Sequence, residues 1–118
     1  MTIYGVGPIL ACHILAELGQ ASRFQRARQV VRAAGLDPVV SESGESKRRG
    51  RLAKHGSPQL RWALVEAAHH ARHQRAPDGQ LYSGVKGRAG SQAAVLTVAR
   101  KIGRRAYHQL AQLERKAA

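Results

Sequence analysis

Apolar residues along this chain recur every three to four positions, which is the spacing of an α-helix. The first apolar run extends from Ile9 to Leu18. Pro8 suits the first helical position before it, and Gly19 suits the stop after it. Because the run is apolar nearly all round, we expect a helix that is buried on several sides.

Two further helices are indicated by capping residues. Ser22 is a typical N-cap, and the apolar positions behind it keep helical spacing up to Gly35. Ser57-Pro58 predicts an N-cap and a first-turn proline for a helix over about 58–75. The apolar stripe of that helix consists of Leu60, Ala63, Leu64, Ala67 and Ala71.

The C-terminal third is also helical in pattern. Ala76-Pro77-Asp78-Gly79 predicts a turn, and residues 82–90 predict a short helix that decays into a basic, Gly-rich link. A last long helix is expected from Ser91 to about residue 116, with one apolar face made of Val95, Val98, Ile102, Ala106, Leu110 and Leu113. The pattern as a whole predicts an all-α fold.

Residues 36–56 have no sustained hydrophobic period and contain Asp37-Pro38, Ser43-Gly44, Gly50 and Gly56. We interpret them as a long loop with a short extended piece at Val39-Val40. Loops longer than about 12–15 residues in compact domains are usually functional or disordered. The loop and the start of the next helix carry a dense set of cations, namely Lys47, Arg48, Arg49, Arg51, Lys54 and Arg61.

The net charge of the chain limits the classes of binding partner that we expect. The chain of 118 residues has 20 Lys and Arg against 7 Asp and Glu, a net charge of +13. We expect one domain, 1–118, that binds nucleic acid, because each neutralised phosphate releases counterions. An acidic membrane surface is the weaker alternative, since the basic run adjoins no apolar, aromatic helix face.

Other locations and sites are disfavoured. No run approaches the 18 apolar residues of a membrane span, and the N-terminus lacks the order of a signal peptide. Cys12 is the single cysteine, so neither an internal disulfide nor a cysteine metal site is expected. We expect an intracellular, cytoplasmic and nucleoid-associated protein with no membrane contact.

Gly5-Val6-Gly7 before a helix resembles the hairpin of a helix-hairpin-helix DNA-binding motif. In that motif, glycines let the backbone approach phosphate at a helix N-terminus. Gly5 and Gly7 are therefore candidate phosphate contacts, and a plain glycine turn that packs two elements is the alternative. Met1 leaves almost no room for the first helix of the motif. A dinucleotide fingerprint is excluded because a third glycine and a preceding strand are missing.

Ser43 is the candidate nucleophile. A serine hydroxyl can attack a phosphodiester and hold the DNA end as a phosphoserine, and nearby cations can stabilise the phosphorane charge. On chemistry alone Ser41 and Ser46 are equally eligible, and a serine in a Gly-rich loop is more often a turn residue.

Metal binding is disfavoured in this chain. Glu66, His69, His70 and His73 share one helix face, so a divalent metal is conceivable, but a partly exposed polar face is the better interpretation. The seven acids are scattered, apart from Glu42 and Glu45, and provide no carboxylate pair for two-metal nuclease chemistry. We expect neither a metal site nor a cofactor here.

The order of these motifs resembles the C-terminal transposase domain of insertion-sequence transposases related to the Piv DNA invertase (the IS-one-ten family), whose recombinases are guided by a bridge RNA. The matching segments run, in order, GVGPILACHILAELG, FQRARQVVRAAGLDP, SG followed by RRGRLAKHG, LRWALVEAA and VLTVARKIGRRAY. The resemblance covers about residues 5–107.

This resemblance implies a helical domain that contributes a catalytic serine to DNA strand exchange. Its Ser-Gly step falls on Ser43-Gly44, which makes Ser43 the nucleophile, and its basic segment falls on residues 48–56. The full-length enzymes have an N-terminal RNase-H-like domain with a metal-binding carboxylate set. We expect that domain to be absent from this chain, so Mg²⁺ is expected only through it.

We therefore expect the catalytic domain of a serine-using DNA transposase or recombinase that is inactive without its N-terminal domain. DNA is the expected partner, with a guide RNA and a homo-oligomer in the full-length enzyme. The alternative is a non-enzymatic, basic helical module that binds DNA or RNA, and a third possibility is a nonfunctional remnant.

Overall fold

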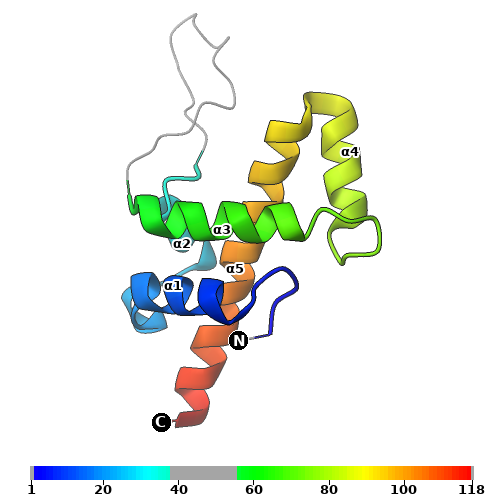
Figure 1. The fold of residues 1–118 in the computed structure, drawn as a ribbon. Coiled ribbons are helices and arrows are strands. Elements are labelled where there is room, and N and C mark those ends of the chain that lie inside the picture. Colours follow the sequence, from blue (N-terminus) through cyan, green and yellow to red (C-terminus); the bar gives the residue numbers. More distant parts are fainter. Residues whose placement is uncertain (1, 38–55, 118) are drawn as a thin grey trace, which may run out of the picture.

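The computed structural model describes residues 2–37 and 56–117. The elements in these ranges are α1 (Pro8–Leu18), the 3₁₀ turn η1 (Ala21–Arg23), α2 (Ala27–Ala33), α3 (Pro58–His70), α4 (Gly79–Ala89) and α5 (Ser91–Ala117) (Figure 1). No strand occurs in the described ranges, and the all-α prediction is confirmed.

The long helix α5 organises the molecule. It contacts α2, α3 and α4 and also η1, while α1 packs against α3 (Figure 1). Gly103 permits a close approach at the centre, because a Cβ built there would lie 3.2 Å from Leu64 Cδ1. A bulkier residue at this point would push α5 away from α3.

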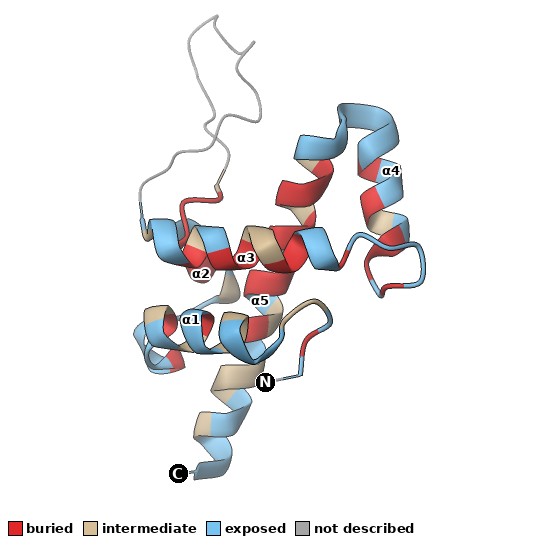
Figure 2. Ribbon diagram, viewed as in Figure 1, coloured by how far each residue is buried: buried red, intermediate tan, exposed pale blue. Residues whose placement is uncertain are grey.

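The five α-helices of the described residues share one hydrophobic core, to which α4 contributes Tyr82 and Val85. Ile14 of α1, Val30 of α2, Leu64 of α3 and Ile102 of α5 are each completely buried. Figure 2 shows the buried residues on the facing sides of these helices, with exposed residues on the outside. Burial of each such side chain stabilises the fold by about 1.5–3 kcal/mol. The core therefore fixes the relative positions of these helices.

Several helix ends lie where the sequence predicts them. Helix α1 begins at Pro8, and Gly19 follows it with a φ of 66°. The Ser57 hydroxyl caps α3 by accepting a hydrogen bond from the Leu60 N–H at 3.1 Å. Gly35 follows α2 with a φ of 71°, and α5 begins at Ser91. The capping signals were therefore sufficient at both ends of α1, at the end of α2 and at the start of α3.

The prediction that Ser22 caps the second helix is wrong. Ser22 lies inside η1, and α2 begins only at Ala27. One reason is local, because Gln29 Oε1 accepts from the Gln25 N–H at 2.6 Å and caps α2 from within. The other reason is that residues 21–24 bind α5. The Ala21 N–H donates to Glu114 Oε2 at 2.6 Å, and the Tyr107 hydroxyl donates to the Phe24 carbonyl at 3.2 Å. These bonds to α5 hold the backbone outside a regular helix.

Two other predicted boundaries also shift. Helix α3 ends at His70, not near residue 75, and α4 begins at Gly79, before Tyr82. The connection is tight, since a Cβ at Gly79 would lie 2.3 Å from the His73 carbonyl oxygen. Only glycine fits this turn.

A buried ion pair holds the turn between α3 and α4 to α5. Asp78 is 3% exposed, and both of its carboxylate oxygens accept hydrogen bonds from the Arg105 guanidinium, one of them at 2.6 Å. The bidentate bond with Arg105 and the charges of Arg105 and Lys101 lower the pKa of Asp78, although burial opposes the shift. Asp78 is thus a structural anchor for α4.

Within residues 2–37 and 56–117, no helix has the length and apolar character needed to cross a membrane.

Candidate nucleic-acid interface

Most of the predicted site residues lie outside the described ranges. These are Ser43, Lys47, Arg48, Arg49, Arg51 and Lys54, all within residues 38–55. Gly5, Gly7 and Arg61 are described. The structure therefore describes the places in the fold at which residues 38–55 begin and end. We call these places, at Leu36 and at Gly56–Ser57, the base of that segment.

The two ends of that segment are held together. The Ser57 N–H donates to the Ala33 carbonyl at 2.8 Å, which joins the start of α3 to the end of α2. Gly56 has a φ of +146°, and a Cβ there would lie 2.1 Å from the same carbonyl oxygen. On the other side, Leu36 is fully buried, and Arg100 Nε donates to its carbonyl at 2.7 Å. The segment therefore leaves and re-enters the fold at one place.

Ser57 also connects this place to α1. Its hydroxyl donates to Glu17 Oε1 while accepting the bond from Leu60 that caps α3. One side chain thereby ties α1, the end of residues 38–55 and the first turn of α3 together. The prediction of Ser57 as an N-cap is confirmed, whereas no sequence signal indicated Glu17 as its partner.

Three arginines surround the two ends. Arg61 Nη1 donates to the Ala34 carbonyl at 3.3 Å, so Arg61 is partly engaged within the fold while its other N–H groups remain donors. Arg32 Nε lies 3.2 Å from Asp37 Oδ2 in a largely exposed ion pair. Burial lowers the pKa of the Arg100 guanidinium and Arg104 lowers it further, whereas Asp37 raises it. Positive charge is therefore concentrated where the segment begins and ends.

Gly5 and Gly7 differ in environment. Gly5 has a φ of +88°, and a Cβ there would lie 2.6 Å from the Ala67 carbonyl oxygen of α3. Gly5 therefore lets the N-terminal turn pack closely against α3, which is the role of a plain glycine turn that packs two elements. Gly7 is the N-cap of α1, and a Cβ at this position would meet nothing within 4 Å. A contact between phosphate and either glycine stays a prediction.

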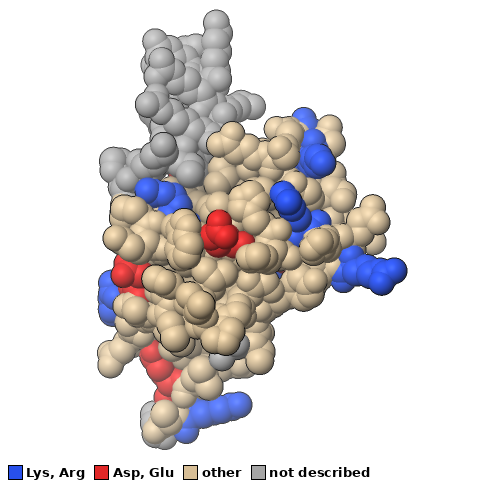
Figure 3. Space-filling model, in the orientation of Figure 1, with Lys and Arg blue, Asp and Glu red and all other residues tan. Residues whose placement is uncertain are grey.

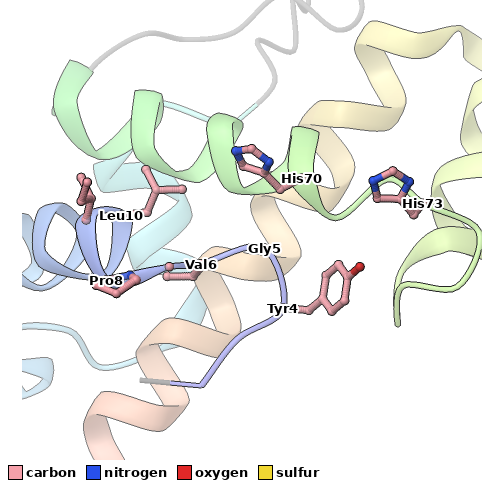
Figure 4. Close-up of a pocket in the computed structure, with 9 residues that line it drawn as sticks. Tyr4, Gly5, Val6, Pro8, Leu10, His70 and His73 are labelled. Carbon is pink, nitrogen blue, oxygen red and sulfur yellow. The ribbon is translucent and has the colours of Figure 1, made fainter.

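A surface groove adjoins this turn. Tyr4 and Val6 lie on one side of it, and His70 and His73 lie on the side of α3 (Figure 4). Because α3 ends at His70, His73 does not continue the helix face on which the sequence pattern placed it. In residues 2–37 and 56–117, no group of three His, Cys, Asp or Glu side chains is arranged to hold a metal ion.

The described carboxylates are largely engaged in internal contacts. Glu17 accepts from Ser57, Asp37 pairs with Arg32, Asp78 pairs with Arg105, and Glu114 accepts from the Ala21 N–H. Three of these contacts join residues that lie 27 to 93 positions apart in the sequence, so no local sequence pattern indicates them. Arg32 and Asp37 are only five positions apart. These residues do not fit a Mg²⁺ site, because each carboxylate has a different partner.

Positive charge is uneven over the surface. Figure 3 shows Lys and Arg side chains over α4 and near the C-terminal end of α3, whereas the surface over α1 carries few of them. Helix α1 itself contains no Lys or Arg.

Comparison with known proteins gives a consistent picture. The family model described as "Transposase IS116/IS110/IS902 family" matches residues 1–83. The chain is 34% identical over 68 residues to a probable family 20 transposase of Pseudomonas aeruginosa, which is 58% of this chain and 20% of that protein. It is 38% identical over 64 residues to the putative transposase y4qE of Sinorhizobium fredii, covering 54% of this chain and 16% of that one.

A third protein, the putative transposase y4rJ of Sinorhizobium fredii, is 35% identical over 68 residues, which is 58% of this chain and 17% of the relative. In each of these comparisons the match spans a fifth of the relative or less.

Proposed function

Because the chain belongs to the Transposase IS116/IS110/IS902 family, we propose that it is the part of a DNA transposase or site-specific recombinase that carries the serine nucleophile. The observation that carries this proposal is the joined base of residues 38–55. Hydrogen bonds from Ser57 to Ala33 and from Arg100 to Leu36 hold both ends of the segment that contains Ser43. A nucleophile on such a segment is tethered at two points to a rigid core.

In this proposal Ser43 attacks a backbone phosphorus of DNA. A bond forms between its hydroxyl oxygen and phosphorus, the hydroxyl proton is lost to solvent, and the bond to the leaving sugar oxygen breaks as that oxygen takes up a proton. The phosphoserine conserves the bond energy for rejoining. Cations at Lys47, Arg48, Arg49, Arg51 and Lys54, together with Arg61, bind DNA and offset the charge of the phosphorane.

The chain by itself would be inactive in strand exchange. Four of its five described carboxylates are engaged in separate contacts, and in this proposal the metal-binding set comes from another domain. We further propose a guide RNA and a homo-oligomer as partners of the complete enzyme, and association with the nucleoid through DNA. The charge of +13 supports a polyanionic partner for each of these roles.

The test is a denaturing gel of end-labelled DNA incubated with this chain, the N-terminal domain of a full-length relative and its guide RNA. We expect a detergent-resistant protein–DNA adduct that disappears with Ser43→Ala. Ser41→Ala and Ser46→Ala are matched controls in the same segment and should keep the adduct.

Two results would count against this function. An adduct that survives Ser43→Ala would remove Ser43 as the nucleophile. Salt-sensitive binding without an adduct in any variant, while an intact relative forms one under the same conditions, would favour a non-enzymatic nucleic-acid-binding module.

A further inference from the structure

Four arginines from three helices lie around the place where the chain leaves α2. They belong to α2, α3 and α5 and are Arg32, Arg61, Arg100 and Arg104. We call them the arginine cluster. The sequence pattern indicated only Arg61, because the other three lie outside the basic run between residues 47 and 61.

Two members of the cluster are held in place by main-chain carbonyls of the exit from α2. Arg61 Nη1 donates to the Ala34 carbonyl at 3.3 Å, and Arg100 Nε donates to the Leu36 carbonyl at 2.7 Å. Both arginines are only partly exposed. Each guanidinium uses one nitrogen in these bonds and keeps further N–H donors for a ligand. The two side chains are therefore positioned by the fold before any ligand binds.

Arg104 brings a second charge close to Arg100. It lies one helical turn further along α5, so the two side chains share one face of the helix. Arg104 is exposed and forms no ion pair with the described residues. Burial lowers the pKa of the Arg100 guanidinium and Arg104 lowers it further, whereas Asp37 raises it. The two like charges thus repel each other within the fold.

Asp37 is the carboxylate that offsets this charge. Its Oδ2 lies 3.2 Å from Arg32 Nε, and its charge also acts on Arg100. In the part of the chain that the structure describes, no other carboxylate forms an ion pair with the arginine cluster. Four positive charges against one negative charge leave a net charge of +3. Further anions would relieve the repulsion that remains.

The chemistry of the cluster fits the phosphates of a nucleic-acid backbone. Guanidinium groups bind phosphate oxygens through paired N–H bonds that are stronger than bonds between neutral groups. Arg100 and Arg104 are about 6 Å apart along α5, at about 1.5 Å per residue. Successive phosphates of one DNA strand rise by about 3.4 Å, so this spacing covers about two phosphate steps. A row of phosphates therefore fits the cluster better than an isolated phosphate does.

We propose that the arginine cluster binds the phosphate backbone of duplex DNA, and that Asp37 pairs with Arg32 as an internal competitor while DNA is absent. This inference rests on the proposed function and deepens it, because it adds Arg32, Arg100 and Arg104 to the DNA contacts. DNA bound there lies at the base of residues 38–55. A phosphate replaces the Asp37 carboxylate at Arg32, and Asp37 is left to the solvent that it already partly reaches.

The first experiment compares Arg104→Gln with Arg88→Gln in the full chain. Both residues are exposed arginines, but Arg88 lies in the last turn of α4 and outside the cluster. Binding of a fluorescent 20-base-pair DNA duplex is measured by anisotropy over a series of salt concentrations. We expect Arg104→Gln to weaken binding about tenfold and to reduce the slope of log K against log salt by about one. Arg88→Gln should change the affinity less than about twofold.

The second experiment tests the competing role of Asp37 with Asp37→Asn. Its matched control is Glu66→Gln, which also removes one negative charge but lies on α3 and has no ion pair with the described residues. We expect Asp37→Asn to tighten duplex binding about threefold and to increase the salt slope by about one, because Arg32 becomes free to bind phosphate. Glu66→Gln should change the affinity less than about twofold. The melting temperature of Asp37→Asn should barely change, because largely exposed ion pairs contribute little to stability.

Three results would overturn this inference. Equal losses in Arg104→Gln and Arg88→Gln would mean that the arginine cluster is not a DNA-binding site. Equal changes in Asp37→Asn and Glu66→Gln would mean that Asp37 does not compete with DNA. A loss in Arg104→Gln that is confined to an RNA duplex of the same sequence would assign the cluster to RNA.

These binding measurements separate the arginine cluster from the proposed function, because they need neither an N-terminal domain nor a covalent adduct. If the cluster variants behave as expected while no adduct forms in the reconstituted enzyme, the cluster is supported and the serine nucleophile fails. If Ser43→Ala abolishes an adduct while Arg104→Gln and Arg88→Gln bind equally well, the proposed function is supported and the cluster is overturned.

Discussion

At the scale of single residues, the fold depends on a few polar contacts that have no redundancy. Asp78 is an example, because Arg105 is the partner of both of its carboxylate oxygens. The pKa of Asp78 is lowered in the folded state, so the unfolded chain binds more protons at acidic pH. The pair therefore stabilises the fold fully above the unfolded pKa of about 3.9, and this stabilisation is lost as pH falls through the lower folded pKa.

We expect Asp78→Asn to reduce the free energy of unfolding by about 1.5–3 kcal/mol at pH 7, since hydrogen bonds to a charged group are lost. The difference from the unmodified chain should shrink below pH 4. Urea denaturation at pH 7, 5 and 3 measures this, and a difference that stays constant over these pH values would contradict the assigned role of Asp78.

Glycine positions give a second prediction at this scale. Gly56→Ala should destabilise the chain by about 2 kcal/mol or more, because φ is +146° and the added Cβ would clash with the Ala33 carbonyl oxygen. Gly87→Ala is the matched control in α4, where a Cβ meets nothing within 4 Å, and it should stabilise by up to about 1 kcal/mol. Thermal melts of both variants decide whether the segment end is as tightly held as the geometry requires.

At the scale of elements, helix starts separate local signals from tertiary ones. Ser57 caps α3 through its own side chain and in addition contacts Glu17 of α1. Ser22 is also a serine, but it caps no helix, because the 3₁₀ turn η1 that contains it binds α5. The same sequence signal was thus right at Ser57 and wrong at Ser22.

Ser57→Ala should therefore cost about 1 kcal/mol or more of stability, as is usual for loss of an N-cap. Ser22→Ala should change stability by less than about 0.5 kcal/mol, as for an exposed residue. The two variants are compared by chemical denaturation. Equal costs would mean that the capping contact at Ser57 contributes nothing beyond an ordinary surface serine.

At the scale of the whole molecule, the excess of positive charge should dominate binding. We expect Arg49→Ala to weaken duplex binding and to reduce the slope of log K against log salt by about one phosphate contact. Ser43→Ala should leave duplex affinity within about 1 kcal/mol, because it removes no charge that could neutralise a phosphate. Anisotropy titrations at several salt concentrations measure both variants.

If Arg49→Ala left the slope of log K against log salt unchanged, Arg49 would not be one of the residues that contact phosphate. A large loss of affinity in Ser43→Ala would instead mean that Ser43 contributes to ground-state binding, which its role as a nucleophile does not require.

The sequence alone was sufficient for the all-α fold, for the bounds of α1, for the start of α3 and for the extent of α5. These features follow from contacts within one or two helical turns, where apolar spacing, proline, glycine and capping residues act directly. The ordered motifs were also sufficient to indicate the transposase family.

Tertiary structure alone decided the rest. The contacts of residues 21–24 with α5, the Asp78–Arg105 pair and the joined ends of residues 38–55 each bring together residues that lie far apart in the sequence. Such contacts depend on how α5 packs against α2, α3 and α4, and no local pattern specifies that packing. A polar residue such as Asp78 has an ordinary turn sequence around it, and only the packed core shows that it is buried against Arg105.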